Sequence, residues 1–392
     1  MSLPSRLANL SYAQLLEFAV DACESSPELK NKADALIAEV APLPSWCVDV
    51  LLSPDLLPQL FSSLGLSEHA AAGVCTTWSH AYSRQLRRCR YVNPRIVRQL
   101  ADVPKQPNGL CMLPGGVLAI TSCNFDSNSS VKFVAARNDT DPQALAACRA
   151  SSLATRRFEF LRGMAHTNDG LLVCNDNPST PALYKFAKYG SMDELATVPA
   201  LADYDRGFKR CAVHQQTQRT YALEEDEAGS HALVLFDANL QVVATVEATG
   251  GVPEEFDEEY GPIRDLAVHG DQVLVLTSDH HLKGSGLRLL DLDGRCLRTI
   301  AAGKFQYPQA VAASHGKAFV IDDDHDYDEE GTGENILFVI DIQSGDIIQR
   351  VRFDLPNPVG RVTAILVDGD EIFVADSNVS RVVVLRYAGA AA

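Results

Sequence analysis

Val273-Leu274-Val275-Leu276 is one of six short apolar runs that recur along the chain after residue 100. The others begin at Val117, Leu171, Thr220, Ala318 and Ile372, so 255 residues separate the first start from the last in five steps, a mean period of 51. A period of this size is typical of β-propellers, in which each repeat forms one blade.

Each apolar run stands second in a unit of expected strands. A strand with a small residue precedes it, and a third strand and, in most units, a fourth follow, with Gly, Asp and Asn turns between them. Four antiparallel strands make a blade, so residues 93–392 are predicted to form an all-β six-bladed β-propeller. The last unit lacks an outer strand, and we expect residues 95–101 to close the sixth blade.

The last repeat ends in Ile372-Phe373-Val374-Ala375-Asp376-Ser377-Asn378. An apolar run followed by Asp-Ser-Asn is similar to the NHL-type repeat, a known propeller-blade family. The other five units lack this ending, so the resemblance is carried by the last blade alone.

The N-terminal part of the chain has a different, helical pattern. Apolar residues follow Ser11 at helical spacing, and a second such segment ends before Pro42 and Pro44. Residues 1–45 are therefore predicted to form a helical extension. Residues 46–92 contain three short apolar segments, each too small to bury its own apolar side alone, which predicts a small all-α domain.

Residues 46–92 resemble an F-box. The family pattern is Pro followed by Leu pairs, then Phe-x-x-Leu and, about ten residues later, Val-Cys-x-x-Trp. This chain departs from it by a Pro-x-x-Leu-Leu opening that is one residue short and by Pro58. The resemblance implies binding to the adaptor of a cullin-RING ubiquitin ligase by Pro54, Leu56, Leu57, Leu60, Phe61, Leu64, Val74, Cys75 and Trp78. The alternative is a helical cap that packs on the rest of the chain.

Composition limits the partners. The formal net charge is -17, from 34 basic and 51 acidic residues, which argues against nucleic acid as the main partner.

No run of 18 apolar residues occurs, and the start lacks the apolar core of a signal peptide, so we expect no membrane insertion and a cytoplasmic or nuclear location. Ten cysteines without a C-x-x-C pair indicate dispersed thiols, with no metal site.

Loops of the propeller provide the first candidate binding surface. In a four-stranded meander, the second-to-third loops and the loops between blades share one face of the ring. Several of these loops are acidic, including 224–227 and 322–330. We expect this face to bind an unknown protein substrate, or else to be merely solvated, and the acidic candidates between two blades are Glu254, Glu255, Asp257, Glu258 and Glu259.

A second candidate set lies three positions before the repeated small residue of each innermost strand. We take this small residue to be Cys111, Ala165, Ala212, Ala267, Ala312 and Ala364. If the side chains at the earlier position point to the channel mouth, they form a ring able to hold a carboxylate or phosphate; otherwise each cation pairs with an acidic neighbour such as Asp265 or Asp205. The six residues are Asn108, Arg162, Lys209, Arg264, Gln309 and Arg361.

Catalysis is not predicted. A propeller hydrolase or lactonase that holds Ca²⁺ in its channel needs inward carboxylates, whereas the expected inner ring is cationic. His280-His281 has no third ligand in sight, and no phosphate-binding or nucleophile-elbow motif occurs. We therefore expect no cofactor and a non-catalytic substrate-recognition subunit, with a metal-dependent propeller enzyme or a propeller scaffold unrelated to ubiquitin as alternatives.

Overall fold

The computed structural model divides the chain into two units, Met1–Arg87 and Arg88–Ala392. It describes residues 92–387 apart from 124–128, 157, 159, 178–180, 188–192, 201–206, 226–230, 248–262, 279–284, 325–333 and 354–360. The predicted helical extension, the F-box-like segment up to residue 91, and the acidic loop at 254–259 lie outside the described residues.

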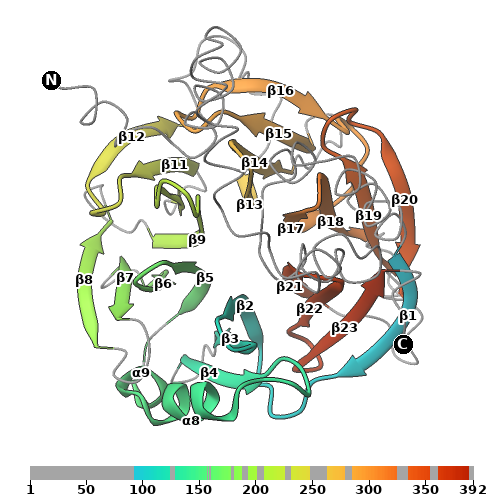
Figure 1. Cartoon of the computed structure of the whole chain (residues 1–392). Coiled ribbons are helices and arrows are strands. Elements are labelled where there is room, and N and C mark those ends of the chain that lie inside the picture. The colour runs from blue at the N-terminus through green and yellow to red at the C-terminus, as the bar shows by residue number, and fades with distance from the viewer. Residues whose placement is uncertain are drawn as a thin grey trace, which may run out of the picture. The chain divides into compact units, whose positions relative to one another are not determined.

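The second unit is the predicted six-bladed β-propeller (Figure 1). In each blade the strands are antiparallel and follow one another outward from the central axis. The first three blades consist of β2 (Pro107–Leu113), β3 (Val117–Ser122) and β4 (Ser130–Ala135); β5 (Leu161–Thr167), β6 (Gly170–Asn175), β7 (Ala182–Ala187) and β8 (Glu194–Pro199); and β9 (Gly207–Val213), β10 (Thr220–Glu225), β11 (His231–Phe236) and β12 (Val242–Glu247).

The other three blades have the same order. The sixth takes its outer strand from the start of the described chain. They consist of β13 (Ile263–His269), β14 (Gln272–Thr277), β15 (Gly286–Leu290) and β16 (Cys296–Ile300); β17 (Pro308–Ser314), β18 (Lys317–Asp324), β19 (Glu334–Asp341) and β20 (Ile347–Arg352); and β21 (Val362–Asp368), β22 (Glu371–Asp376), β23 (Arg381–Tyr387) and β1 (Val92–Gln99).

Six hydrophobic clusters hold the ring together, one at each interface between neighbouring blades. Along β18, Phe319 and Ile321 pack towards the sixth blade, while Ala318 and Val320 pack towards the fourth. The second strand of a blade is thus buried on both sides. This explains why the six apolar runs of the sequence are continuous and do not alternate with polar residues.

Blade 1 has three strands. Beyond β4 the chain forms α8 (Pro142–Ala150) and α9 (Ser152–Thr155), which lie outside β4 where other blades have a fourth strand (Figure 1). Asp141 caps α8 by accepting a 2.9 Å hydrogen bond from the amide of Gln143. Cys148 of α8 is fully buried in the cluster between blades 1 and 2. The helices therefore cover the strand edge that blade 1 leaves open.

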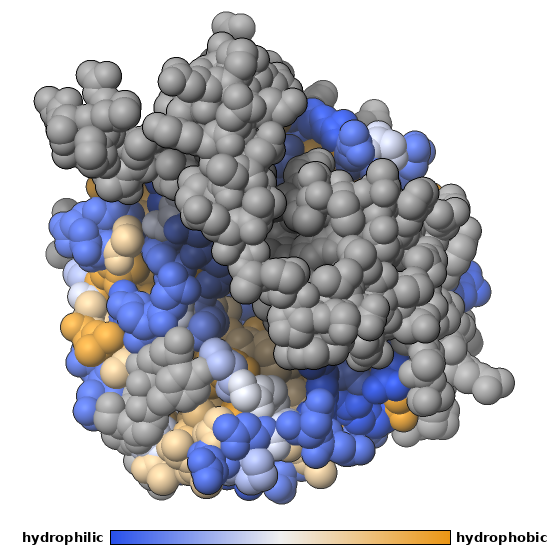
Figure 2. Space-filling view, viewed as in Figure 1, coloured by the Kyte–Doolittle hydropathy of each residue, from blue (hydrophilic) through white to orange (hydrophobic). Residues whose placement is uncertain are grey.

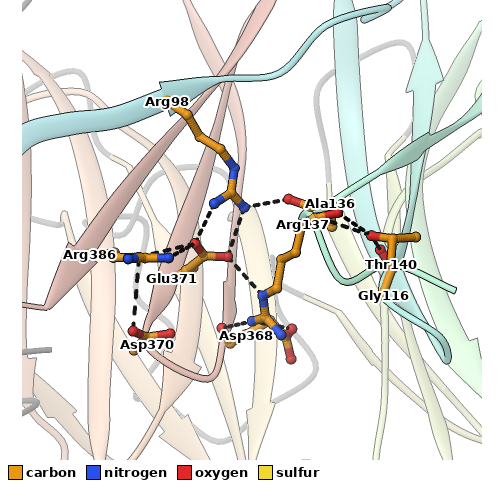
Figure 3. A network of polar contacts seen from close by, with 9 residues as sticks. All are labelled: Arg98, Gly116, Ala136, Arg137, Thr140, Asp368, Asp370, Glu371 and Arg386. Carbon is orange, nitrogen blue, oxygen red and sulfur yellow. Dashed lines mark hydrogen bonds and ion pairs between the residues drawn. The ribbon is translucent and has the colours of Figure 1, made fainter. Parts of the chain in front are cut away.

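The strand that the sequence predicts at residues 95–101 is β1, which pairs antiparallel with β23 and places the start of the propeller beside its end. Glu371 of β22, whose side chain is fully buried, accepts hydrogen bonds from three arginines at this closure, Arg98, Arg137 and Arg386 (Figure 3). Arg98 belongs to β1, the outer strand of blade 6, and Arg137 follows β4 of blade 1. The carboxylate of Glu371 therefore connects the second strand of blade 6 both to its outer strand and to blade 1.

On the face seen in Figure 2, hydrophilic residues make up much of the described surface, with smaller groups of hydrophobic residues between them.

Two acidic residues that the sequence places in exposed loops are instead buried in strands. Glu224 and Asp322 lie within β10 and β18 and are 1% and 2% exposed. Asp322 accepts the amide hydrogens of Gln306 and Tyr307, so it fixes the connection between blades 4 and 5. None of the helices described could span a membrane.

Candidate functional site

The same irregularity occurs in all six blades, where the innermost strand begins. The pairing of the innermost strand with the second strand shifts there by one residue, which is a β-bulge. A bulge takes one residue out of the ladder, bends the strand and redirects its side chain. The shifts fall at Asn108, at Arg162 and Gly163, and at Lys209, Arg264, Gln309 and Thr363.

Five of the six residues predicted for the cationic ring therefore occupy these bulges. In blade 6 the bulged residue is Thr363, and Arg361 lies two residues earlier, before β21 begins. The predicted position of the small residue in the innermost strand is also corrected. In blade 5 this residue, Ala312, pairs with Phe319 of the second strand. The equivalent residue of blade 6 is Leu366, which pairs with Phe373, and not Ala364. Blade 1 shows the same error by one residue, because Met112, not Cys111, holds that place.

Side chains from neighbouring blades bind backbone carbonyls near the bulges. The hydroxyl of Thr121 donates to the carbonyl of Arg162 at 2.5 Å, which links blade 1 to blade 2. The hydroxyl of Thr363 donates to the carbonyl of Pro107 at 2.6 Å, which links blade 6 to blade 1. The bulges thus leave polar backbone groups that cross-blade hydrogen bonds satisfy.

Arg210 of β9 spans the central axis. Its Nη2 donates to the carbonyl of Thr363 at 3.0 Å, although blades 3 and 6 stand opposite each other in the ring (Figure 1). Gly163 of β5 lets the backbone of β9 pass close to it, since a Cβ there would lie 2.8 Å from the Cα of Arg210. A guanidinium therefore occupies the axis at the level of the bulges.

Asp265 of β13 is the carboxylate partner of Arg210, with its Oδ1 3.4 Å from the Arg210 Nε. Its Oδ2 also accepts the amide of Val311 in blade 5, at 2.9 Å. Burial raises the pKa of Asp265, and the nearby Arg210 and the amides of Val311 and Leu266 offset only part of that rise. Arg210 and Asp265 together connect blades 3, 4, 5 and 6.

Two more ion pairs involve the cations at the bulges of blades 2 and 3. Arg162 Nε donates to Asp176 Oδ2 at 3.1 Å, and Lys209 Nζ pairs with Glu225. Burial raises the pKa of Asp176, against the opposing effect of Arg162 and Lys209. We call these six residues the axial cluster: Arg162, Asp176, Lys209, Glu225, Arg210 and Asp265.

In every pair of the axial cluster the cation is more exposed than the carboxylate. The side-chain exposures are 23% against 15% for Arg162 and Asp176, and 29% against 22% for Lys209 and Glu225. For Arg210 and Asp265 they are 16% and 10%. Each pair is neutral as a whole. Arg162 and Lys209, the two more exposed cations, could donate charge-assisted hydrogen bonds to an anionic group, whereas the Nη atoms of Arg210 already bind the carbonyls of Lys209 and Thr363.

The remaining members of the predicted ring have separate places. Asn108 Nδ2 donates to the carbonyl of Leu161 at 3.5 Å, and Gln309 Nε2 to the carbonyl of Tyr307 at 3.0 Å. Arg264 is half-buried and Arg361 is exposed.

Sequence reasoning missed Arg210, Asp176 and Glu225, which complete the cluster. A signal for Arg210 was present: its place in the repeat is held by small or aliphatic residues in blades 1, 2, 5 and 6. Asp265 holds that place in blade 4, so two charged residues at a strand position that is otherwise apolar could have indicated a pair.

No protein-family model matches the chain, and no curated protein matches it. Among solved structures, the PQQ-bound aldose sugar dehydrogenase from Streptomyces coelicolor is similar at 14% identity, covering 75% of this chain and 97% of that one, with a TM-score of 0.47. BamB from Moraxella catarrhalis is similar at 12% identity, 75% and 96% coverage and a TM-score of 0.43. Raptor from Chaetomium thermophilum is similar at 11% identity, with 98% of this chain but 40% of that one covered and a TM-score of 0.47.

These similarities concern the fold alone. Within the residues that the structure describes, no group of three or more His, Cys, Asp or Glu side chains could hold a metal ion. The axial cluster contains partly exposed guanidinium and ammonium groups, which can donate charge-assisted hydrogen bonds.

Proposed function

We propose that this protein is the substrate-recognition subunit of an F-box type cullin-RING ubiquitin ligase and has no catalytic activity of its own. The F-box-like segment, residues 46–92, binds the adaptor in this proposal, and the propeller binds a protein substrate. Support in the N-terminal part is sequence alone: Leu60 and Phe61 after the Leu pairs, then Val74, Cys75 and Trp78 at the family spacing.

The axial cluster supports a binding role for the propeller. Asp176, Glu225 and Asp265 each lie beside a cation that is more exposed than the carboxylate itself. Such pairs present hydrogen-bond donors at fixed positions, which suits orienting a ligand group more than transferring a proton.

Co-purification of the full-length chain with the adaptor subunit tests this proposal. We expect the wild type to retain the adaptor, and Leu60→Arg and Trp78→Ala to lose it. Leu297→Arg is the matched control, because Leu297 is 54% exposed on the outer strand β16 of the propeller. Far-ultraviolet circular dichroism and the unfolding temperature of each variant show whether the chain still folds.

Wild-type protein that does not retain the adaptor, or variants that retain it as the wild type does, would contradict the ligase role. If the propeller nevertheless captures a partner protein, the chain is a propeller scaffold unrelated to ubiquitin.

A further inference from the structure

Three aromatic rings surround one guanidinium on the outer side of the propeller, between blades 1 and 2. The Cζ of Arg156 lies 4.8 Å from the ring centroid of Phe158, 5.1 Å from that of Tyr184 and 5.5 Å from that of Phe186. All three distances are within the range of cation–π attraction, about 6 Å. The guanidinium therefore contacts three rings at once.

The rings do not depend on Arg156 for their positions. Their centroids are 5.7 to 6.2 Å apart, and Phe158 and Phe186 belong to the hydrophobic cluster between blades 1 and 2, where they are 6% and 1% exposed. Tyr184 is half-buried and packs against the same cluster. Removal of the Arg156 side chain would leave a preformed aromatic cup.

A carboxylate completes this site. Glu194, at the start of β8, pairs with Arg156 and also accepts a hydrogen bond from Thr197. The hydrogen bonds from Thr197 and Arg156 lower the pKa of Glu194, so its carboxyl is ionised at neutral pH. Both Arg156 and Glu194 have side chains 36% exposed. We call Phe158, Tyr184, Phe186 and Glu194 the rim cup.

The rim cup exists because blade 1 has no fourth strand. After α9 the chain returns to blade 2, and on the way Phe158 forms a single bridge with Ser129 instead of a ladder. Phe160 in this connection has a φ of +55°, which is strained for a bulky side chain. Arg156 and Phe158 both belong to this connection, whereas Tyr184 and Phe186 belong to β7 and Glu194 belongs to β8.

We propose that the rim cup is a binding site for an arginine side chain of a partner protein, and that Arg156 occupies it until the partner displaces it. The present occupant shows that a guanidinium fits: its Cζ lies within 5.5 Å of the three ring centroids and its Nη1 donates to Glu194. A strongly acidic protein, with a net charge of -17, also favours a basic partner.

Ligand-observed NMR titration of the full-length chain with N-acetylarginine amide tests the site. A single side chain of this size should bind with a dissociation constant of about 1 mM. Arg156→Ala empties the cup, so we expect it to bind the probe about ten-fold more tightly than the wild type, which must first displace its own arginine. N-acetylcitrulline amide, a neutral molecule of nearly the same shape, should not bind measurably.

Tyr184→Ala in the Arg156→Ala background should weaken arginine binding several-fold, and Glu194→Gln should do the same. Where Arg156→Ala does not fold, as judged by its unfolding temperature, Arg156→Lys replaces it, with a smaller gain in affinity expected. Equal binding by Arg156→Ala and wild type, or equal binding of citrulline and arginine, would overturn the proposal. If Arg156→Ala binds the probe and the wild type does not bind it at all, Arg156 is a permanent part of the fold, and this result would also overturn the proposal. Adaptor binding plays no part in these results.

Discussion

Arg98 donates two hydrogen bonds to the buried carboxylate of Glu371, from Nη1 to Oε1 at 2.6 Å and from Nη2 to Oε2 at 2.9 Å. The two residues are 273 positions apart in the chain. A two-point contact fixes the plane of the guanidinium as well as its distance, so it also fixes where β1 lies on β23. Ring closure therefore has a polar anchor in addition to the strand pairing.

We expect Glu371→Gln to lower the free energy of unfolding by about 2–3 kcal/mol at pH 7, because three guanidinium groups lose one buried acceptor charge. Denaturant unfolding measures this. Asp370→Asn is the matched control: the Asp370 carboxylate is 4.0 Å from Arg386 and 39% exposed, so its loss should change stability by less than about 0.5 kcal/mol. Equal effects of the two substitutions would contradict the role of Glu371.

The same carboxylate predicts a pH dependence. Burial alone would raise the pKa of Glu371, but the hydrogen bonds from Arg98, Arg137 and Arg386 lower it more, and the net pKa is below its ordinary value. A group with a lowered folded-state pKa stabilises the protein above its unfolded pKa, and this stability is lost as the pH falls through the folded pKa. The stability difference between wild type and Glu371→Gln should thus shrink as the pH falls below about 4.

Arg210→Ala leaves the Asp265 carboxylate buried without its cation, so we expect a loss of about 3 kcal/mol at pH 7. Burial raises the pKa of Asp265 in the folded protein, so protonation is favoured there, and the stability loss should decrease at lower pH. Adding Asp265→Asn should restore part of the stability, because the amide carries no charge. Arg295→Ala, at an exposed residue in the turn before β16, should stay within about 0.5 kcal/mol of wild type in the same denaturant titration.

The ring was predictable from sequence because its repeating signal comes from burial. Runs such as 318–321 pack against blades on both sides, and every blade needs one, so the period of 51 survives although the loops differ in length. The closing strand was predictable because the last blade lacked a fourth strand. The helices α8 and α9 were not, since the pattern of the other blades predicts a strand there and no repeat describes its replacement.

The axial cluster was predictable only in part. Five ring positions follow from counting back three residues from the small residue of the innermost strand. In blade 6 small or apolar residues stand at both Ala364 and Leu366, so the count could not choose between them; it started from Ala364 and reached Arg361, whereas the bulge falls at Thr363. Contacts that cross the axis, such as Arg210 to the carbonyl of Thr363, depend on blades that are opposite in space. The repeat period of the sequence shows which blades are neighbours, but it does not show which side chains reach across the central axis.

Gly170→Ala tests the close packing of the second and third strands in blade 2. A Cβ at Gly170 would lie 1.9 Å from the carbonyl oxygen of Phe186, which is part of the β6–β7 ladder, so we expect a loss of about 3 kcal/mol. Gly270→Ala is the matched comparison in blade 4, where a Cβ meets nothing within 4 Å but the φ is +53°. Its cost should be about 1 kcal/mol, from backbone strain alone. Thermal unfolding that ranks the two variants in the opposite order would show that the clash is relieved by movement of the strand.

Partner binding by the propeller should weaken as salt increases, because charged groups provide both candidate surfaces. Lys209→Glu, Arg162→Glu and Arg361→Glu test the axial side, and Glu254→Lys with Glu255→Lys tests the acidic loop. We expect each charge reversal to lower affinity about ten-fold at low salt and less at 0.5 M salt, since screening removes the same interaction. Arg295→Glu carries an equal change of charge in a turn on the opposite face and should leave the affinity unchanged. If the affinity is the same at low and high salt, in the wild type and in the variants, charged groups do not contribute to recognition of the partner.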